Sequence, residues 1–132
     1  MKFHHVALVV SDIAKSSKII KSDLKIIKTG KIYKDKIIGV KLRFLDLNDN
    51  TKLELIQPLN NKSPINKFLE KKNTSNIHHL AYTCKDLDKT CNNLRKKGYG
   101  FLTNFLDVKA FMYVRAIFLL SPLNFIVELI EE

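Results

Sequence analysis

The chain has 132 residues, 45% of them apolar, which is enough to build the core of a single domain. Its formal charge of +10 comes from basic residues spread along the chain with few aromatic residues between them, which disfavours a nucleic-acid-binding surface. Cys84 and Cys91 have neither metal-type nor disulfide-framework spacing, and no secretion signal or membrane-length apolar run is present, so we expect a cytoplasmic protein with no membrane or nucleic-acid partner.

The first half of the sequence predicts a strand and a helix, followed by three strands. Residues 3–10 alternate as a strand does, which places His5 on one face and His4 on the other. We expect Ser11 to cap the helix that follows. The apolar stripe of this helix is predicted to contain Ile13, Ile20 and Leu24. The three further strands are predicted at residues 25–33, 37–46 and 52–57, with a turn at Asn48-Asp49-Asn50.

The second half predicts the same order of elements after a polar connector. Within the connector, residues 63–70 are expected to form a short helix with Ser63 at its cap and Pro64 at its first position. A strand is predicted at residues 77–84 and a helix at residues 85–97, which Gly98 ends. The last strands are predicted at residues 99–106, 114–120 and 125–130.

The two halves are an internal repeat, because a shift of 74 residues without a gap aligns them along their whole length. The matched pairs are His4/His78, His5/His79, Ala7/Ala81, Asp12/Asp86, Lys15/Lys89, Thr29/Thr103, Val40/Val114, Phe44/Phe118, Leu45/Leu119, Glu54/Glu128, Leu55/Leu129 and Ile56/Ile130. This register predicts two βαβββ modules, residues 1–57 and 77–132, joined by a linker at 58–76 and related by an approximate two-fold axis.

One histidine and one glutamate recur in each half at the same spacing. Glu54 follows His5 by 49 residues, and Glu128 follows His79 by the same 49. Two imidazoles and two carboxylates suit a divalent metal ion of borderline hardness. A carboxylate within an apolar strand is also costly unless it is paired, metal-bound or wet. We therefore interpret the four residues as candidate metal ligands.

Each of these residues has a simpler explanation when it is considered alone. A single histidine on an apolar strand is commonly a core residue, and either glutamate fits a solvent-exposed strand face. The match of all four positions at equal spacing favours the metal site. His4 and His78 fall on the opposite strand faces and are expected to have structural roles.

With these motifs the sequence resembles the vicinal oxygen chelate superfamily, which includes glyoxalase I, methylmalonyl-CoA epimerase and bleomycin-resistance proteins. The resemblance covers essentially the whole chain, and its pieces are most similar to the epimerase branch. The stretches that carry it are residues 3–10, 53–58, 63–69, 77–82 and 125–131, including the Ser-Pro-Ile at 63–65 and the His-His at 78–79. The resemblance implies an α+β fold, one glyoxalase-like domain over residues 1–132, with curved mixed sheets enclosing a cleft.

The resemblance also implies a chemistry. His5, Glu54, His79 and Glu128 would bind one divalent ion, which is nickel, cobalt, zinc, manganese or iron. The protein would be a lyase or isomerase that removes a proton next to a metal-bound carbonyl through an enolate, with Glu128 or Glu54 as the base. A small anionic substrate is implied, either a glutathione hemithioacetal or an acyl-CoA thioester. A homodimer is implied as well, with the site within one chain or swapped between two.

Two alternatives stay open at this point. One is lactoylglutathione lyase proper, and the other is a non-catalytic drug-sequestering protein, although such relatives generally lack the full set of four ligands. Lys41 stands where some epimerases carry a carboxylate, so the substrate identity does not transfer. Lys41, Arg43 and Arg115, on the polar faces of the predicted strands, are either contacts for an anionic substrate or ordinary solvated charges.

Overall fold

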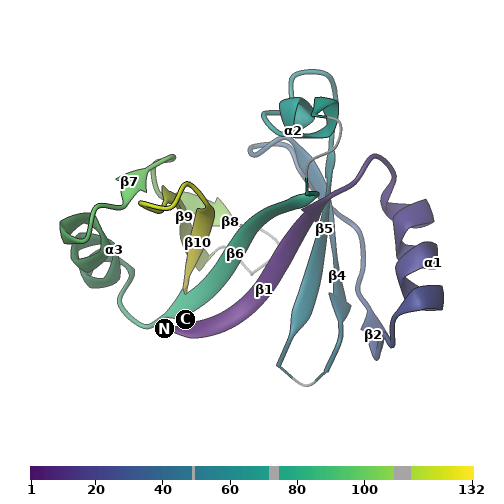
Figure 1. Ribbon diagram of the computed structural model, residues 1–132, viewed down its shortest axis with the longest axis horizontal. Coiled ribbons are helices and arrows are strands. Elements are labelled where there is room, and N and C mark those ends of the chain that lie inside the picture. Colours follow the sequence, from purple (N-terminus) through teal and green to yellow (C-terminus); the bar gives the residue numbers. More distant parts are fainter. Residues whose placement is uncertain (49, 72–74, 109–113) are drawn as a thin grey trace. The chain divides into compact units, whose positions relative to one another are not determined.

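The computed structural model describes residues 1–48, 50–71, 75–108 and 114–132. In the first half of the chain, the elements are β1 (Lys2–Val9), α1 (Ile13–Asp23), β2 (Lys28–Thr29), β3 (Tyr33–Asp35), β4 (Val40–Asp46), β5 (Lys52–Pro58) and α2 (Asn66–Glu70). In the second half, they are β6 (Ile77–Cys84), α3 (Leu87–Lys96), β7 (Gly100–Phe101), β8 (Leu106–Val108), β9 (Val114–Leu120) and β10 (Ile126–Glu131). The predicted α+β class is confirmed, with ten strands and three helices in the described residues (Figure 1).

The chain divides into two compact units, each of which holds one copy of the repeat. We call residues His5–His78 the N-half unit, and Met1–His4 together with His79–Glu132 the C-half unit. Strand β1 therefore begins in one unit and continues in the other. The predicted single domain, the module boundaries, the two-fold relation and the enclosed cleft stay predictions.

In the N-half unit the strands are ordered β2-β4-β5-β1, and β3 also pairs with β4. Strands β1 and β5 are parallel, while the other pairs are antiparallel. Helix α1 packs against β4 and β5. Its core contains Val10, Ile13, Leu45 and Leu55, which are all buried. One face of β4 and β5 is thereby covered by α1.

The C-half unit repeats this arrangement with the strand order β6-β10-β9-β7, and β8 pairs with β9. Strands β6 and β10 are parallel, and helix α3 packs against β10. The core between them is formed by Cys84, Leu87, Cys91, Ile117, Leu119, Val127 and Leu129. Both chain termini belong to this unit, where Lys2 Nζ lies 3.2 Å from Glu132 Oε1.

The predicted strands at 25–33 and 99–106 are wrong in extent, because each edge strand consists of two short pieces. Thr29 pairs with Leu45 and Tyr33 pairs with Leu42, so one extra residue lies between β2 and β3. An extra residue of this kind is a bulge that interrupts the ladder. The register between β7 and β8 also changes, by two residues. The internal repeat is therefore preserved less well in the edge strands than in β4 and β5.

The helix starts also differ from the prediction. The cap of α1 is Asp12, not Ser11, and its carboxylate accepts from the Lys15 N–H at 3.0 Å. Asp86 caps α3 in the same way, by accepting from the Lys89 N–H at 2.8 Å. An aspartate at this position satisfies one of the unpaired N–H groups at the helix start.

Two smaller predictions are wrong, and a third includes a residue outside the described ranges. Leu24 lies past the end of α1 and is 52% exposed, so it is not part of the apolar stripe. Helix α2 begins at Asn66, two residues after the predicted first position Pro64, and Ile65 at its start makes no side-chain cap. Asp49 of the predicted turn lies outside the described residues, although the Asn48 side chain accepts from the Asn50 and Thr51 N–H groups.

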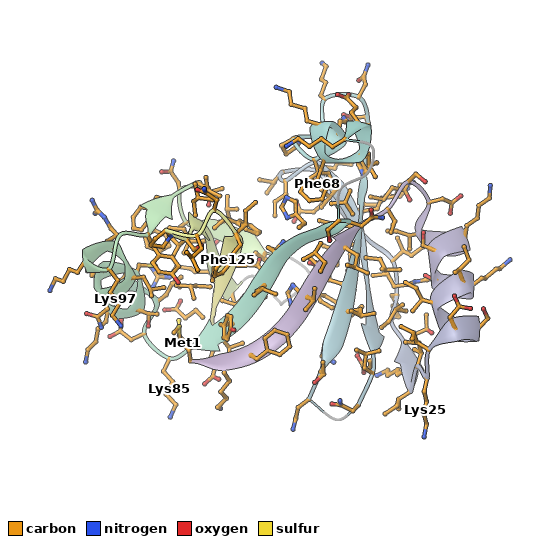
Figure 2. All side chains as sticks on the ribbon, in the orientation of Figure 1. Met1, Lys25, Phe68, Lys85, Lys97 and Phe125 are labelled. Carbon is orange, nitrogen blue, oxygen red and sulfur yellow. The ribbon has the colours of Figure 1, made fainter. Side chains whose placement is uncertain are left out.

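The surface is consistent with the spread of basic residues along the sequence. Lys25, Lys85 and Lys97 are exposed and extend away from the ribbon (Figure 2). Within the described ranges, none of the helices is both long enough and apolar enough to cross a membrane.

Candidate metal centre

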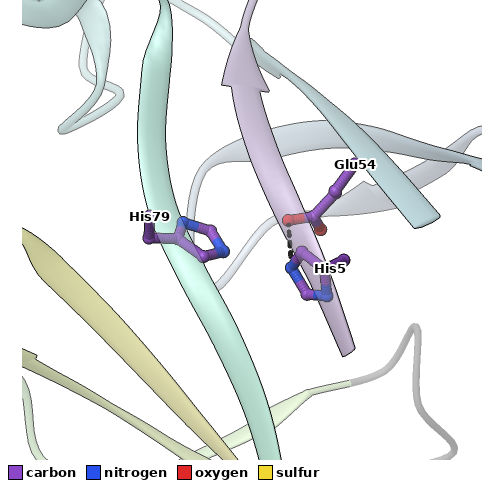
Figure 3. Close-up of side chains that lie close together, drawn as sticks. All are labelled: His5, Glu54 and His79. Carbon is purple, nitrogen blue, oxygen red and sulfur yellow. Dashed lines mark ion pairs between the residues drawn. The ribbon is translucent and has the colours of Figure 1, made fainter. Parts of the chain in front are cut away.

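The N-half unit brings together His5 from β1 and Glu54 from β5. The parallel register pairs Ala7 with Glu54, and His5 lies on the same face of β1 as Ala7. His5 Nε2 is 3.1 Å from Glu54 Oε2 (Figure 3). Neither side chain reaches solvent, since His5 is 0% exposed and Glu54 is 5% exposed. The predicted pair at residues 5 and 54 is therefore a buried imidazole–carboxylate contact.

The C-half unit contains the same pair. Strand β10 places Glu128 opposite Ala81 of β6, and His79 lies on the face that Ala81 shares. His79 Nε2 is 3.5 Å from Glu128 Oε2, and both residues are 4% exposed. The repeat of the sequence is thus a repeat of side-chain geometry, and in both halves the Nε2 atom faces the carboxylate.

Ala7 and Ala81 explain how each glutamate can face its histidine. Both alanines are fully buried and lie directly opposite a glutamate in the parallel ladder. Because neighbouring residues on one face of a sheet are close, a larger side chain here would occupy the space between imidazole and carboxylate. The sequence repeat matched these two alanines without giving them a role.

Buried carboxylates of this kind need compensation. A buried carboxylate is costly unless it is paired, hydrogen-bonded or bound to a metal. An imidazole nitrogen directed at each carboxylate supplies a partner, and the same nitrogen is a metal ligand when it is deprotonated. Two imidazoles and two carboxylates form a donor set that suits a divalent ion of borderline hardness. Each half therefore supplies one imidazole and one carboxylate of the types that such an ion binds.

Phe44 and Phe118 belong to the same clusters, although sequence reasoning gave them no function. The rings of His5 and Phe44 meet edge to face, with centroids 5.2 Å apart. The rings of His79 and Phe118 meet in the same way at 5.1 Å. The signal that could have identified them was their match in the repeat. Phe118 follows Phe44 by 74 residues, as His79 follows His5.

His78 differs from the two candidate ligands in its surroundings. It is only partly buried, and its ring lies edge to face with Phe68 at a centroid distance of 5.2 Å. His4 is also partly buried and lies on the other face of β1 from His5. The structural roles expected for His4 and His78 stay predictions.

The basic strand residues Lys41, Arg43 and Arg115 lie on the opposite sheet face from the His–Glu pairs. Alternation along β4 directs Phe44 towards His5 and Arg43 towards α1, where its Nη1 donates to Ser17 Oγ at 3.2 Å. Lys41 shares the face of Arg43. Their role in binding a substrate stays a prediction.

Arg115 is engaged within its own unit. Its guanidinium donates to Asp88 on α3 and to Glu131 on β10, at 2.8 Å in each case. The hydrogen bonds that Glu131 accepts from Arg115 hold the pKa of the Glu131 carboxyl below its usual value. A substrate role for Arg115 also stays a prediction, because its charge is already paired with two carboxylates.

Comparison with known proteins gives a consistent result. A family model described as the Glyoxalase/Bleomycin resistance protein/Dioxygenase superfamily matches residues 4–110. The ethylmalonyl-CoA/methylmalonyl-CoA epimerase of Cereibacter sphaeroides is 33% identical over 97 residues, which cover 74% of this chain and 71% of that protein. The mitochondrial methylmalonyl-CoA epimerase of Mus musculus is 29% identical over 109 residues, or 83% of this chain. The match spans 60% of the length of the mouse protein.

The fold is also found among solved structures. The crystal structure of methylmalonyl-CoA epimerase from Mycobacterium tuberculosis superposes with a TM-score of 0.83 at 25% identity. The superposition covers 98% of this chain and 87% of the other. The similarity therefore extends over both repeats.

Proposed function

Since this chain belongs to the glyoxalase/bleomycin resistance protein/dioxygenase superfamily, which is the vicinal oxygen chelate superfamily, we propose that it is a metal-dependent isomerase of the acyl-CoA epimerase type. The observation that carries the proposal is the pair of matched, buried His–Glu contacts. The epimerase names of the relatives support the reaction class.

In this proposal His5, Glu54, His79 and Glu128 together hold one divalent ion per chain. When bound, such an ion supplies Lewis acidity at the carbonyl oxygen of the substrate. Each half contributes one imidazole and one carboxylate, and the apolar strands around them keep water away. The two pairs of one site come either from a single chain or from two chains of a homodimer, and the proposal holds for both arrangements.

One of the two glutamates takes the proton from the carbon next to the carbonyl, and the epimerisation is complete when a proton from solvent is returned to the opposite face of that carbon. We assign this role to Glu128, and the exchange experiment below tests that choice against Glu54. Glu54 then stays a ligand. Since each site offers buried carboxylates in apolar surroundings, proton transfer to one of them would be little disturbed by solvent.

The proposed substrate is an acyl-CoA thioester with an acidic C–H group beside the thioester carbonyl. Both relatives described above are named for such substrates. The net charge of +10 attracts an anion of this kind, although it does not select among anions. A glutathione hemithioacetal shares the proton-transfer chemistry, so the experiment below includes it as a second substrate.

The metal is tested by element analysis of the purified protein and of His5→Ala and His79→Ala. We expect about one equivalent of a divalent transition metal in the natural protein and its loss in both variants. His78→Ala is the matched control, because His78 neighbours His79 in sequence but lies on the other strand face, and it should keep the metal. A metal-free natural protein that does not take up added nickel, cobalt or zinc would refute the proposal.

The reaction is tested by solvent deuterium exchange followed by mass spectrometry. Methylmalonyl-CoA should gain one deuterium at its α-carbon, while the hemithioacetal of glutathione and methylglyoxal should remain unchanged. Glu128→Gln should lose exchange by at least about 100-fold and retain its metal, as expected when a general base is removed. Full exchange in this variant would exclude Glu128 as the base. Turnover of the hemithioacetal instead would assign the protein to the glyoxalase I reaction.

A further inference from the structure

We propose that Phe44 and Phe118 are positioning residues that fix the imidazole rings of His5 and His79, so that each Nε2 stays directed at the metal-binding carboxylate. This inference rests on the proposed function, because it concerns how the proposed ligands are held. Neither phenylalanine offers a ligand atom, so both act only through the histidines and glutamates that they contact.

In the N-half unit Phe44 lies beside both members of the pair. Its ring centroid is 5.2 Å from that of His5, with an interplanar angle of 73°. On the antiparallel ladder between β4 and β5, Phe44 is directly opposite Glu54. Side chains at directly opposed positions are in contact on the sheet face. One phenyl ring therefore borders the imidazole and the carboxylate of the same pair.

The C-half unit repeats this contact independently. The Phe118 ring centroid is 5.1 Å from that of His79, with an interplanar angle of 79°. Phe118 is directly opposite Glu128 on the ladder between β9 and β10. The same aromatic residue, orientation and register thus recur in both halves. Packing alone would accept any apolar residue of similar size at these two positions.

The segments that directly follow β2 and β7 hold both phenylalanines from the other side. The Gly30 N–H donates to the Phe44 carbonyl at 2.8 Å, and a Cβ at position 30 would lie 2.9 Å from that oxygen. In the other unit, the Leu102 N–H donates to the Phe118 carbonyl at 2.9 Å, and the Phe118 N–H donates to Thr103 Oγ1 at 3.1 Å. The backbone of each phenylalanine is therefore held on both sides, by the ladder to β5 or β10 and by the segment that follows β2 or β7.

An aromatic ring suits this task for a physical reason. Rotation of an imidazole about its last side-chain bond is broad, and it would carry Nε2 away from the carboxylate. The edge-to-face arrangement is the preferred geometry of two aromatic rings and is lost when either ring turns. A leucine at position 44 or 118 would keep the site apolar but would let the imidazole turn.

The test uses Phe44→Leu and Phe118→Leu in the full chain, with Phe68→Leu as the matched control. Phe68 makes the same kind of contact, at 5.2 Å and 65°, with the non-ligand His78. Binding of Co²⁺ is followed by calorimetry and by visible absorption. We expect each of the first two variants to bind about tenfold more weakly, at the lower end of the effect of residues that orient metal ligands. Their absorption bands should also shift, whereas Phe68→Leu should match the natural protein.

Two further measurements complete the test. Phe44→Tyr and Phe118→Tyr keep an aromatic ring and should restore the affinity for Co²⁺. Carbon-13 relaxation of the imidazole rings in the metal-free protein should show increased motion of His5 in Phe44→Leu and of His79 in Phe118→Leu, with the His4 ring unchanged. Unchanged ring motion, or Co²⁺ affinity equal to that of the natural protein, would overturn the inference. A natural protein that does not bind Co²⁺ would instead refute the proposed function, and the relaxation measurement would still judge the inference.

Discussion

Replacing Gly30 by alanine tests how tightly the edge strand of the N-half unit is packed. Gly30 lies between β2 and β3, where its N–H donates to the Phe44 carbonyl at 2.8 Å. An added Cβ would lie 2.9 Å from the same oxygen. The atom that the Cβ would meet is a backbone oxygen, so no flexible side chain can move aside, and β2 must shift away from β4.

The expected loss follows from two contributions. Insertion of a methyl group into a closely packed position costs roughly 1–3 kcal/mol. The hydrogen bond that weakens when the strand shifts contributes about 1 kcal/mol. Part of this loss is offset because alanine restricts the unfolded chain, by roughly 0.4–1 kcal/mol. We therefore expect Gly30→Ala to lower the free energy of unfolding by about 2 kcal/mol.

Gly100→Ala is the matched control in the other unit. Gly100 also lies in a short edge strand, but a Cβ there would have no atom within 4 Å. Only the effect on the unfolded chain remains, so this variant should be stabilised by roughly 0.4–1 kcal/mol.

Urea denaturation followed by circular dichroism measures both changes. With a slope of roughly 1–3 kcal/mol per molar urea, the Gly30→Ala midpoint should fall by about 1 M. The slope itself should stay constant if both variants unfold in the same way. Equal midpoints for Gly30→Ala and Gly100→Ala would refute the close approach of Gly30 to Phe44.

Two further predictions concern the helices. Asp12→Ala and Asp86→Ala should each lower the free energy of unfolding by about 1 kcal/mol, because these aspartates make the cap hydrogen bonds. Urea denaturation measures the loss, and Ser11→Ala should change the free energy of unfolding little. Burial raises the pKa of the Cys91 thiol from 9.0 to about 11. The Cys91 thiol of the unfolded chain therefore loses its proton near pH 9, whereas that of the folded chain keeps it. The free energy of unfolding consequently has its full value below pH 9 and falls by about 2 kcal/mol as the pH rises to 11. Denaturation at pH 8 and at pH 10.5 should show a weaker pH dependence in Cys91→Ala, and an equal dependence would contradict the assignment.

The helix starts show which part of a cap prediction the sequence supports and which part needs the structure. Ser11 and Asp12 are both good cap residues and are adjacent, so propensity could not choose between them. The choice depends on which residue has the extended backbone, and Asp12 has φ −149°. The edge strands were harder, because a strand that pairs on one side only carries a weak alternation, and a bulge interrupts it.

Arg115 illustrates a different limit of sequence patterns. Alternation places Arg115 on the polar face of its strand, which left open whether it contacts an anionic substrate or is an ordinary solvated charge. Alternation cannot indicate what covers that face. In the C-half unit, α3 brings Asp88 against Arg115, and the neighbouring strand adds Glu131. The three side chains form an ion-pair network through a helix that is 27 residues away from Arg115 in the sequence.

The sequence by itself determined the two copies and the order of their elements, and it singled out His5, Glu54, His79 and Glu128 as candidate ligands, because a repeat of 74 residues preserves both periodicity and spacing. Only the tertiary structure decided what lies around each pair. Ala7 and Ala81 face the glutamates, and Phe44 and Phe118 border both members of each pair, because of the strand registers. The parallel registers of β1 with β5 and of β6 with β10 join strands that are distant in the chain, and residue patterns along one strand do not fix which residues pair across them.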